Sequence, residues 1–171
     1  MSLGFYLHIP YCFSKCRYCD FYSHPGERGV PEAYVDALLR ELSRFAPEAP
    51  LQPDTLYFGG GTPSLLRPEQ AKRLIDAARP MPGAEITLEA NPETVTEESL
   101  AGFREAGVNR ISFGVQSARD TQLRTLGRPH TAKQARAPLP PLGGQGLRTS
   151  AATSCWHCRT TPKPSLTKRW N

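Results

Sequence analysis

The chain has 171 residues, enough for one domain with a sizeable core, and its 39% hydrophobic and 22% charged residues are typical of a soluble globular protein. No apolar run approaches the roughly 18–20 residues of a membrane span, and no signal peptide is recognisable, so we expect a cytoplasmic protein. Five of the 21 Lys and Arg residues but none of the 16 Asp and Glu residues follow residue 136. The net charge of +5 therefore belongs to the tail, which argues against a nucleic-acid-binding surface.

Strand and helix patterns alternate along residues 5–136. In chain order the sequence predicts a strand over 5–9, a helix over 31–45, a strand over 55–58, a helix over 68–79, a strand over 85–90, a helix over 96–106, a strand over 110–115 and a helix that begins at 132–136. Strands that alternate with helices through short links form parallel βαβ units. The predicted fold class is α/β, a partial parallel (βα) barrel of about four βα units.

Unusual residues follow each predicted strand. A cysteine motif follows the first strand, three glycines (59–61) follow the second, Glu89 ends the third and Gln116 follows the fourth. In parallel barrels the functional site lies at the carboxyl ends of the strands. We therefore expect these four segments to form one site.

The cysteine motif is Cys12-x3-Cys16-x2-Cys19. Three thiolates in one loop can hold three irons of a cubane iron–sulfur cluster and leave the fourth iron open to another ligand. A zinc site is the alternative, with His8 or His24 as its fourth ligand. The chain has five cysteines and no secretory context, which favours metal binding or catalysis over disulfide bonds.

With Tyr18 before its last cysteine, this motif resembles that of the radical S-adenosylmethionine (SAM) superfamily. Four further segments resemble its coproporphyrinogen-oxidase-like branch, and most of all the haem chaperones of that branch: YFGGGTPSLL (57–66), LEANPETV (88–95), GVNRISFGVQS (107–117) and LGRPHT (126–131). The resemblance implies a truncated barrel of the radical SAM type. It also implies a [4Fe–4S] cluster on Cys12, Cys16 and Cys19, with SAM bound to the open iron, and haem in the intact family member.

The resemblance also assigns further cofactor contacts and leaves the catalytic residue unassigned. These contacts are Tyr6, Tyr18, Gly60, Gly61, Thr62, Glu89, Gln116 and Arg128. From the residues alone, the glycines also fit a tight turn, Glu89 a solvent-facing strand position and Arg128 a surface loop.

Phe21 separates two branches of the resembled family. Oxygen-independent coproporphyrinogen oxidases have a further cysteine at this position, whereas haem chaperones lack it. The sequence therefore favours a haem chaperone, whose partners are haem-accepting proteins and an electron donor. An oxidase of porphyrin biosynthesis and an inactive metal-binding fragment are the alternatives.

Residues 137–171 differ in character from the rest of the chain. The segment APLPPLGGQG is rich in proline and glycine, and no periodic pattern follows it, so the prediction is a disordered tail after a domain of residues 1–136. The pair Cys155 and Cys158 gives a weak metal-site signal. Read in a shifted frame, codons for residues 147–163 can encode PQDISGDLMLALPDHTQ, which resembles the family's next strand. Our hypothesis is a frame shift after about residue 136.

Overall fold

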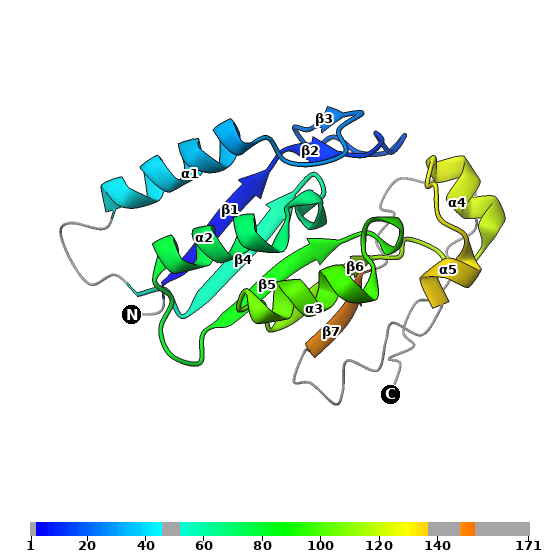
Figure 1. Ribbon diagram of the computed structural model, residues 1–171. Coiled ribbons are helices and arrows are strands. Elements are labelled where there is room, and N and C mark those ends of the chain that lie inside the picture. Colours follow the sequence, from blue (N-terminus) through cyan, green and yellow to red (C-terminus); the bar gives the residue numbers. More distant parts are fainter. Residues whose placement is uncertain (1–2, 46–51, 137–147, 153–171) are drawn as a thin grey trace.

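Five parallel strands form one sheet, in the order β1-β4-β5-β6-β7 (Figure 1). The structure is a computed structural model that describes residues 3–45, 52–136 and 148–152. The strands are β1 (Gly4–Ile9), β4 (Thr55–Gly60), β5 (Glu85–Ala90), β6 (Arg110–Gly114) and β7 (Arg148–Ala152). The four predicted strands are confirmed, and their order in the sheet follows their order in the chain.

Helices α1 (Glu32–Phe45), α2 (Pro68–Ala78) and α3 (Glu97–Glu105) lie side by side over one face of the sheet (Figure 1). Two short helices, α4 (Asp120–Leu126) and α5 (Ala132–Arg136), follow β6, and 3-10 turns follow β4 (η1, Pro63–Leu65) and β5 (η2, Pro92–Thr94). The predicted helices are confirmed. The sequence did not predict α4, because seven residues are too few for a clear helical period.

Alternating residues of the strands face these helices and form the core. In β1, β4, β5 and β6 the apolar side chains at alternate positions are buried in the core, as expected for a sheet face covered by helices, and β5 also buries Thr87. The largest fully buried side chains include Phe58, Phe103, Ile9, Leu56, Leu74, Leu88, Leu100 and Ile111.

The opposite face of the sheet is polar and aromatic. Tyr6 pairs in register with Tyr57, and Glu89 pairs with Ser112, so these side chains lie on the face away from the helices. The apolar side chains of these strands are turned toward the helices, so the uncovered face of the sheet is not an apolar surface.

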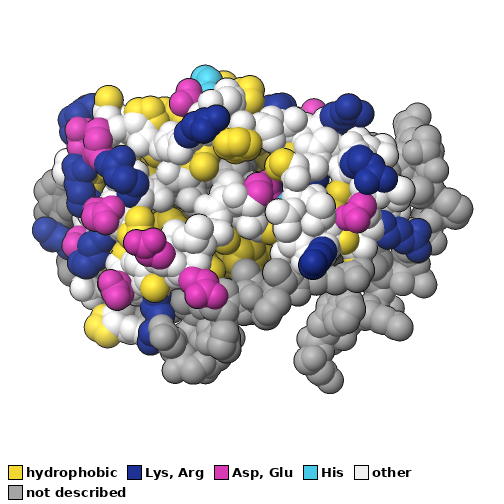
Figure 2. All heavy atoms as spheres, turned by 45° about the vertical axis from the view of Figure 1, so that its right-hand side comes forward, with side chains coloured by type: hydrophobic (Ala, Val, Ile, Leu, Met, Phe, Trp, Pro, Cys, Tyr) yellow, Lys and Arg dark blue, Asp and Glu magenta, His cyan; other side chains and the backbone are white. Residues whose placement is uncertain are grey.

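Charged side chains are interspersed over the helical surface. Figure 2 shows Lys and Arg side chains alternating with Asp and Glu side chains on the visible helical face. Arg73 of α2, for example, donates to Glu32 (2.8 Å) and Asp36 (2.6 Å) of α1. Such exposed pairs each contribute about 0–1 kcal/mol to stability, so they add little to the packing of α1 against α2.

One part of the tail is ordered, contrary to the prediction of disorder after residue 136. Arg148–Ala152 forms β7, which pairs in parallel with all five residues of β6. The backbone hydrogen bonds at the edge of β6 explain this strand, since an open parallel edge accepts extended chain of many sequences. Residues 137–147 and 153–171, which include Cys155 and Cys158, lie outside the described residues.

Candidate cofactor site

The carboxyl ends of β1, β4, β5 and β6 surround one cavity of about 490 Å³. It is lined by Cys12, Ser14, Lys15, Cys16, Tyr18, Cys19, Phe21, Ser23, Gly60, Gly61, Thr62, Pro63, Glu89, Ala90, Asn91, Ser112, Gly114, Gln116 and Arg128. Residues of all four strand-end segments thus line the same cavity. Parallel strands bring their carboxyl ends to the same edge, which explains why segments far apart in sequence meet.

The cysteine loop is fixed to the end of β4. Within the loop, β2 (Tyr11–Cys12) pairs with β3 (His24–Pro25) and closes it. The amide of Gly61 donates to the Ile9 carbonyl (2.8 Å), and the amide of Thr62 donates to the Tyr11 carbonyl (2.7 Å). These bonds continue the pairing of β1 and β4 into the loop, so the position of Cys12 depends on the backbone of the glycine segment.

The three cysteines line the same cavity but differ in exposure. Cys12 is buried, whereas Cys16 and Cys19 are half-buried, and the Cys19 amide donates to the Cys16 carbonyl (3.1 Å) in a tight turn. Among the described residues, no three His, Cys, Asp or Glu side chains are spaced to hold a single metal ion. Zinc needs its thiolates on one ion, whereas a cubane cluster receives each thiolate on a different iron and tolerates wider spacing.

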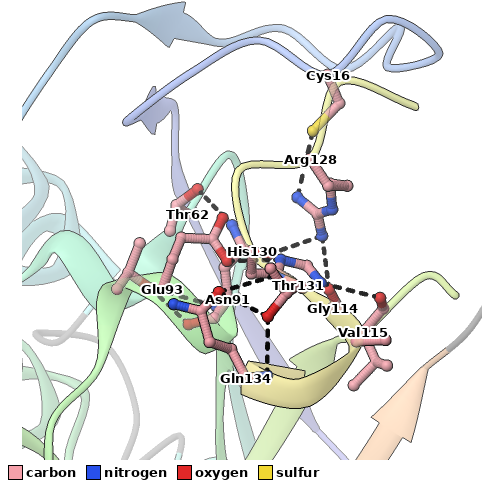
Figure 3. A network of polar contacts seen from close by, with 12 residues as sticks. Cys16, Thr62, Asn91, Glu93, Gly114, Val115, Arg128, His130, Thr131 and Gln134 are labelled. Atoms are coloured by element: carbon pink, nitrogen blue, oxygen red, sulfur yellow. Dashed lines mark hydrogen bonds and ion pairs between the residues drawn. The ribbon is translucent and has the colours of Figure 1, made fainter. Parts of the chain in front are cut away.

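Arg128 joins the cysteine loop to the strand ends (Figure 3). Its Nη1 donates to Cys16 Sγ (3.2 Å), while its Nη2 donates to Asn91 Oδ1 (2.9 Å) and to the Gly114 carbonyl (2.7 Å). Burial raises the pKa of the Cys16 thiol, and the neighbouring guanidinium acts in the opposite direction. A cation that contacts the sulfur in this way favours the thiolate that a metal needs.

Each glycine of the 59–61 segment leaves room for a different neighbour. A Cβ on Gly59 would lie 2.7 Å from the Tyr6 ring, and one on Gly60 would lie 2.6 Å from the His8 ring. Gly60 also has a φ of +114°, a conformation that side chains disfavour. The glycines therefore permit close packing of β1 and its loop on β4, in addition to any approach of a cofactor.

Glu89 lies on the inner face of β5 and is held in place by β4. Its Oε1 accepts from the Tyr57 hydroxyl (2.8 Å) and its Oε2 from the Gly60 amide (3.3 Å). Burial, followed by the hydrogen bond to Glu89, raises the pKa of Tyr57 to about 12, so this phenol remains a donor at neutral pH. The carboxylate is thus oriented at the cavity wall, not turned to solvent.

Three other predicted cofactor contacts occupy different places. Tyr18 and Gln116 line the cavity, and Gln116 adopts a left-handed φ of 64° where the chain leaves β6. A non-glycine residue in this region costs about 1–2 kcal/mol, which is typical of a functional position. Tyr6 does not line the cavity. It stacks on Tyr57 with ring centroids 6.0 Å apart and is 57% exposed.

Two polar groups near the site were not singled out from the sequence. Asn91 bridges two predicted residues, since its Nδ2 donates to Thr62 Oγ1 (3.2 Å) and its Oδ1 accepts from Arg128. His130 is buried between Glu93 Oε2 (2.8 Å) and the Val115 carbonyl (3.1 Å) (Figure 3). Both residues belong to motifs that carry the family resemblance, LEANPETV and LGRPHT. Their place in these motifs was the sequence feature that could have indicated a role at the site.

His130 fixes the loop that carries Arg128. Its ring nitrogens both face oxygen acceptors, and its side chain is 0% exposed while that of Glu93 is 15% exposed. We expect His130→Ala to cost about 3 kcal/mol by leaving the Glu93 carboxylate without its partner. A calorimetric melting temperature lower by roughly 6–12 °C is the expected result. Replacement of the exposed His24 with alanine serves as the control, and equal melting of the two variants would contradict this role.

The profile of the radical SAM superfamily matches residues 6–138 of the chain. The chain belongs to the radical SAM superfamily. The chain is 43% identical to the heme chaperone HemW of Escherichia coli over 153 residues, a match that covers 86% of the chain and 40% of that protein. It is 42% identical to the HemW of Mycobacterium tuberculosis, with 78% of the chain and 36% of that protein covered. The chain thus spans about 40% or less of the length of these relatives.

Among solved structures, the radical SAM enzyme coproporphyrinogen III oxidase (HemN) of E. coli matches with a TM-score of 0.78 and 30% identity. The match covers 88% of this chain and 36% of that chain. It confirms the α/β fold of a partial radical SAM barrel. None of the described helices has the length and apolar character of a membrane span.

Radical SAM membership implies a [4Fe–4S] cluster and SAM as cofactors. When bound, they supply one-electron reduction and a cleavable sulfonium. The residues present fit this pair, because three cysteines, an oriented carboxylate and an arginine face one cavity. The cationic Arg128 suits the carboxylate of an amino-acid-derived ligand, and the anionic Glu89 suits its hydrogen-bond-donating groups. Phe21 and Tyr18 add aromatic side chains to the lining of the same cavity.

Proposed function

We propose that this chain provides the cluster-binding and SAM-binding part of a haem chaperone. The observation that carries the proposal is the convergence of Cys12, Cys16 and Cys19 with Gly60–Thr62, Glu89, Gln116 and Arg128 on one cavity. The 43% identity to a heme chaperone supports the branch. In this proposal haem and haem-accepting proteins are the cargo and partners of the intact protein, which works in the cytoplasm with an electron donor.

Phe21 supports the chaperone over an oxidase. Its side chain lines the cavity and is 66% exposed, at the position where the oxidase branch carries a further cysteine. A phenyl ring can neither ligate a metal nor transfer a hydrogen atom as a thiol does. Coproporphyrinogen oxidation is the second candidate, supported by the structural match to HemN. An inactive metal-binding fragment is the third candidate.

The test is anaerobic reconstitution of the full 171-residue chain with iron and sulfide. We expect a reducible cluster whose electron paramagnetic resonance (EPR) spectrum changes when SAM is added, because SAM binds the open iron. Cys12→Ser should abolish the signal, whereas the double variant Cys155→Ser/Cys158→Ser should retain it. A zinc-loaded protein without a reducible cluster would refute the proposal. Haem titration of the intact protein, followed at the Soret band, then separates a chaperone from an oxidase, which instead consumes coproporphyrinogen.

We also propose that residues from about 137 onward are read in a shifted frame. Whichever codons are used, the run from Cys155 to Cys158 reads as Leu-Ala-Leu in the alternative frame, where the family's next strand is expected, and this supports the proposal. Sequencing the coding DNA tests the idea. A frame that encodes the present tail, with no family-like sequence in the other frame, would refute it.

A further inference from the structure

The guanidinium of Arg128 lies between the cysteine loop and the ends of β5 and β6 (Figure 3). One nitrogen reaches Cys16 Sγ, which is 112 residues away in sequence, and the other reaches Asn91 Oδ1 and the Gly114 carbonyl. A flexible arginine has many rotamers, so its aim at one sulfur depends on the acceptors that hold its other nitrogen.

Asn91 is the side chain that supplies this hold. It follows β5 directly, and both ends of its amide are used, one by Arg128 and one by the buried Thr62. The position of the amide is therefore fixed by Thr62, which lies just after β4. The end of this amide that faces Arg128 is the acceptor, Oδ1, and it holds Nη2. Nη1 is then directed at Cys16 Sγ.

Gly114 provides the space for this arrangement. A Cβ at this position would lie 2.7 Å from Arg128 Nη2 and 2.7 Å from Asn91 Oδ1. The φ of Gly114 is not in the left-handed region, so backbone conformation does not explain a glycine here. Close approach of Arg128 and Asn91 to the strand does explain it.

A hydrogen bond from a cation to a ligating sulfur stabilises the reduced, more negative state of an iron–sulfur cluster. We propose that Asn91 is a positioning residue that holds Arg128 against Cys16 and thereby raises the reduction potential of the cluster. This inference rests on the proposed function, in which Cys16 is a cluster ligand. It assigns Asn91 a role that does not require contact with SAM.

The test measures the midpoint potential of the reconstituted cluster by EPR-monitored redox titration without SAM. We expect Asn91→Ala to lower the potential, by 59 mV for each tenfold change in the one-electron equilibrium constant. Arg128→Ala should lower it at least as much. The double variant should match Arg128→Ala alone, because Asn91 acts through Arg128.

Asn109→Ala is the matched control. Asn109 also uses both ends of its amide, accepting from the Ile86 amide (2.9 Å) and donating to the Ala84 carbonyl (2.7 Å), but at the opposite end of β5 and β6. It should reduce thermal stability about as much as Asn91→Ala and leave the potential unchanged. An unshifted potential in Asn91→Ala, or additive shifts in the double variant, would overturn the inference alone. A wild-type chain that assembles no reducible cluster would overturn the proposed function as well.

Discussion

Gly61→Ala is expected to prevent cluster assembly in an otherwise folded chain. A Cβ at Gly61 would lie 2.6 Å from the Tyr11 carbonyl oxygen, 3.0 Å from the Ile9 carbonyl oxygen and 3.0 Å from Cys12 Sγ. Two of these atoms are backbone and cannot rotate away, so the cysteine loop must move. Overpacking of this kind costs about 1–3 kcal/mol, and here the displacement falls on a proposed cluster ligand. Iron and sulfide content after reconstitution, with circular dichroism as a measure of folding, checks the prediction.

Gly29→Ala is the control for this substitution. A Cβ at Gly29 would meet the Leu65 carbonyl at 3.9 Å, which is ordinary contact, and the position lies in the connection between the cysteine loop and α1. Its cluster content should equal that of the wild type. A Gly61→Ala variant that binds a full complement of iron would show that the loop adapts without loss of its ligand geometry.

Much of the fold was predictable because its strands and helices carry strong local patterns. The strand over 85–90 has the predicted bounds, since its apolar residues alternate with polar ones. Helix α4 escaped prediction because its stability comes from packing of Leu123 and Leu126 and not from a long period. Strand β7 escaped for a related reason, because RTSAA has no strand pattern of its own and pairs with the edge of β6.

The sequence predicts which residues line the candidate site better than it predicts how these residues contact one another. All of the predicted site residues except Tyr6 line the cavity, because the positions after parallel strands meet at one edge. The links between them depend on side-chain geometry that the sequence does not specify. The contact between Arg128 and Cys16, for example, spans 112 residues. The bridging role of Asn91 likewise appears only once Thr62 and Arg128 are placed on either side of it.

These links also explain why one cavity can couple two cofactors. The cysteine loop contacts Gly61, which follows β4, and contacts the last residue of α4 through the Arg17 amide, which donates to the Leu126 carbonyl (3.1 Å). A ligand that draws Glu89 and Arg128 toward the cavity therefore acts on both supports of the loop. Binding of SAM and the position of the cluster are thus expected to depend on each other.

Glu89→Gln is expected to weaken SAM binding by roughly 10–100-fold with little change in stability. The amide oxygen of glutamine can still accept from the Tyr57 hydroxyl, so the contact between β4 and β5 survives. What disappears is the negative charge that faces the cavity. Hydrogen bonds to charged groups are worth about 1.5–3 kcal/mol, which corresponds to this loss of affinity. Equilibrium titration of SAM into the reconstituted chain, followed by EPR, measures the effect.

Two further variants separate a cofactor contact from a structural role for Glu89. Glu85→Gln changes a carboxylate on the same face at the other end of β5, paired with Arg110 at 3.2 Å, and should leave SAM affinity unchanged. Tyr57→Phe removes the bond that orients Glu89 but keeps its charge, so its loss of affinity should be smaller than that of Glu89→Gln. If Tyr57→Phe weakens binding and Glu89→Gln does not, the negative charge of Glu89 does not contact SAM, because a direct contact requires that charge at the cavity wall.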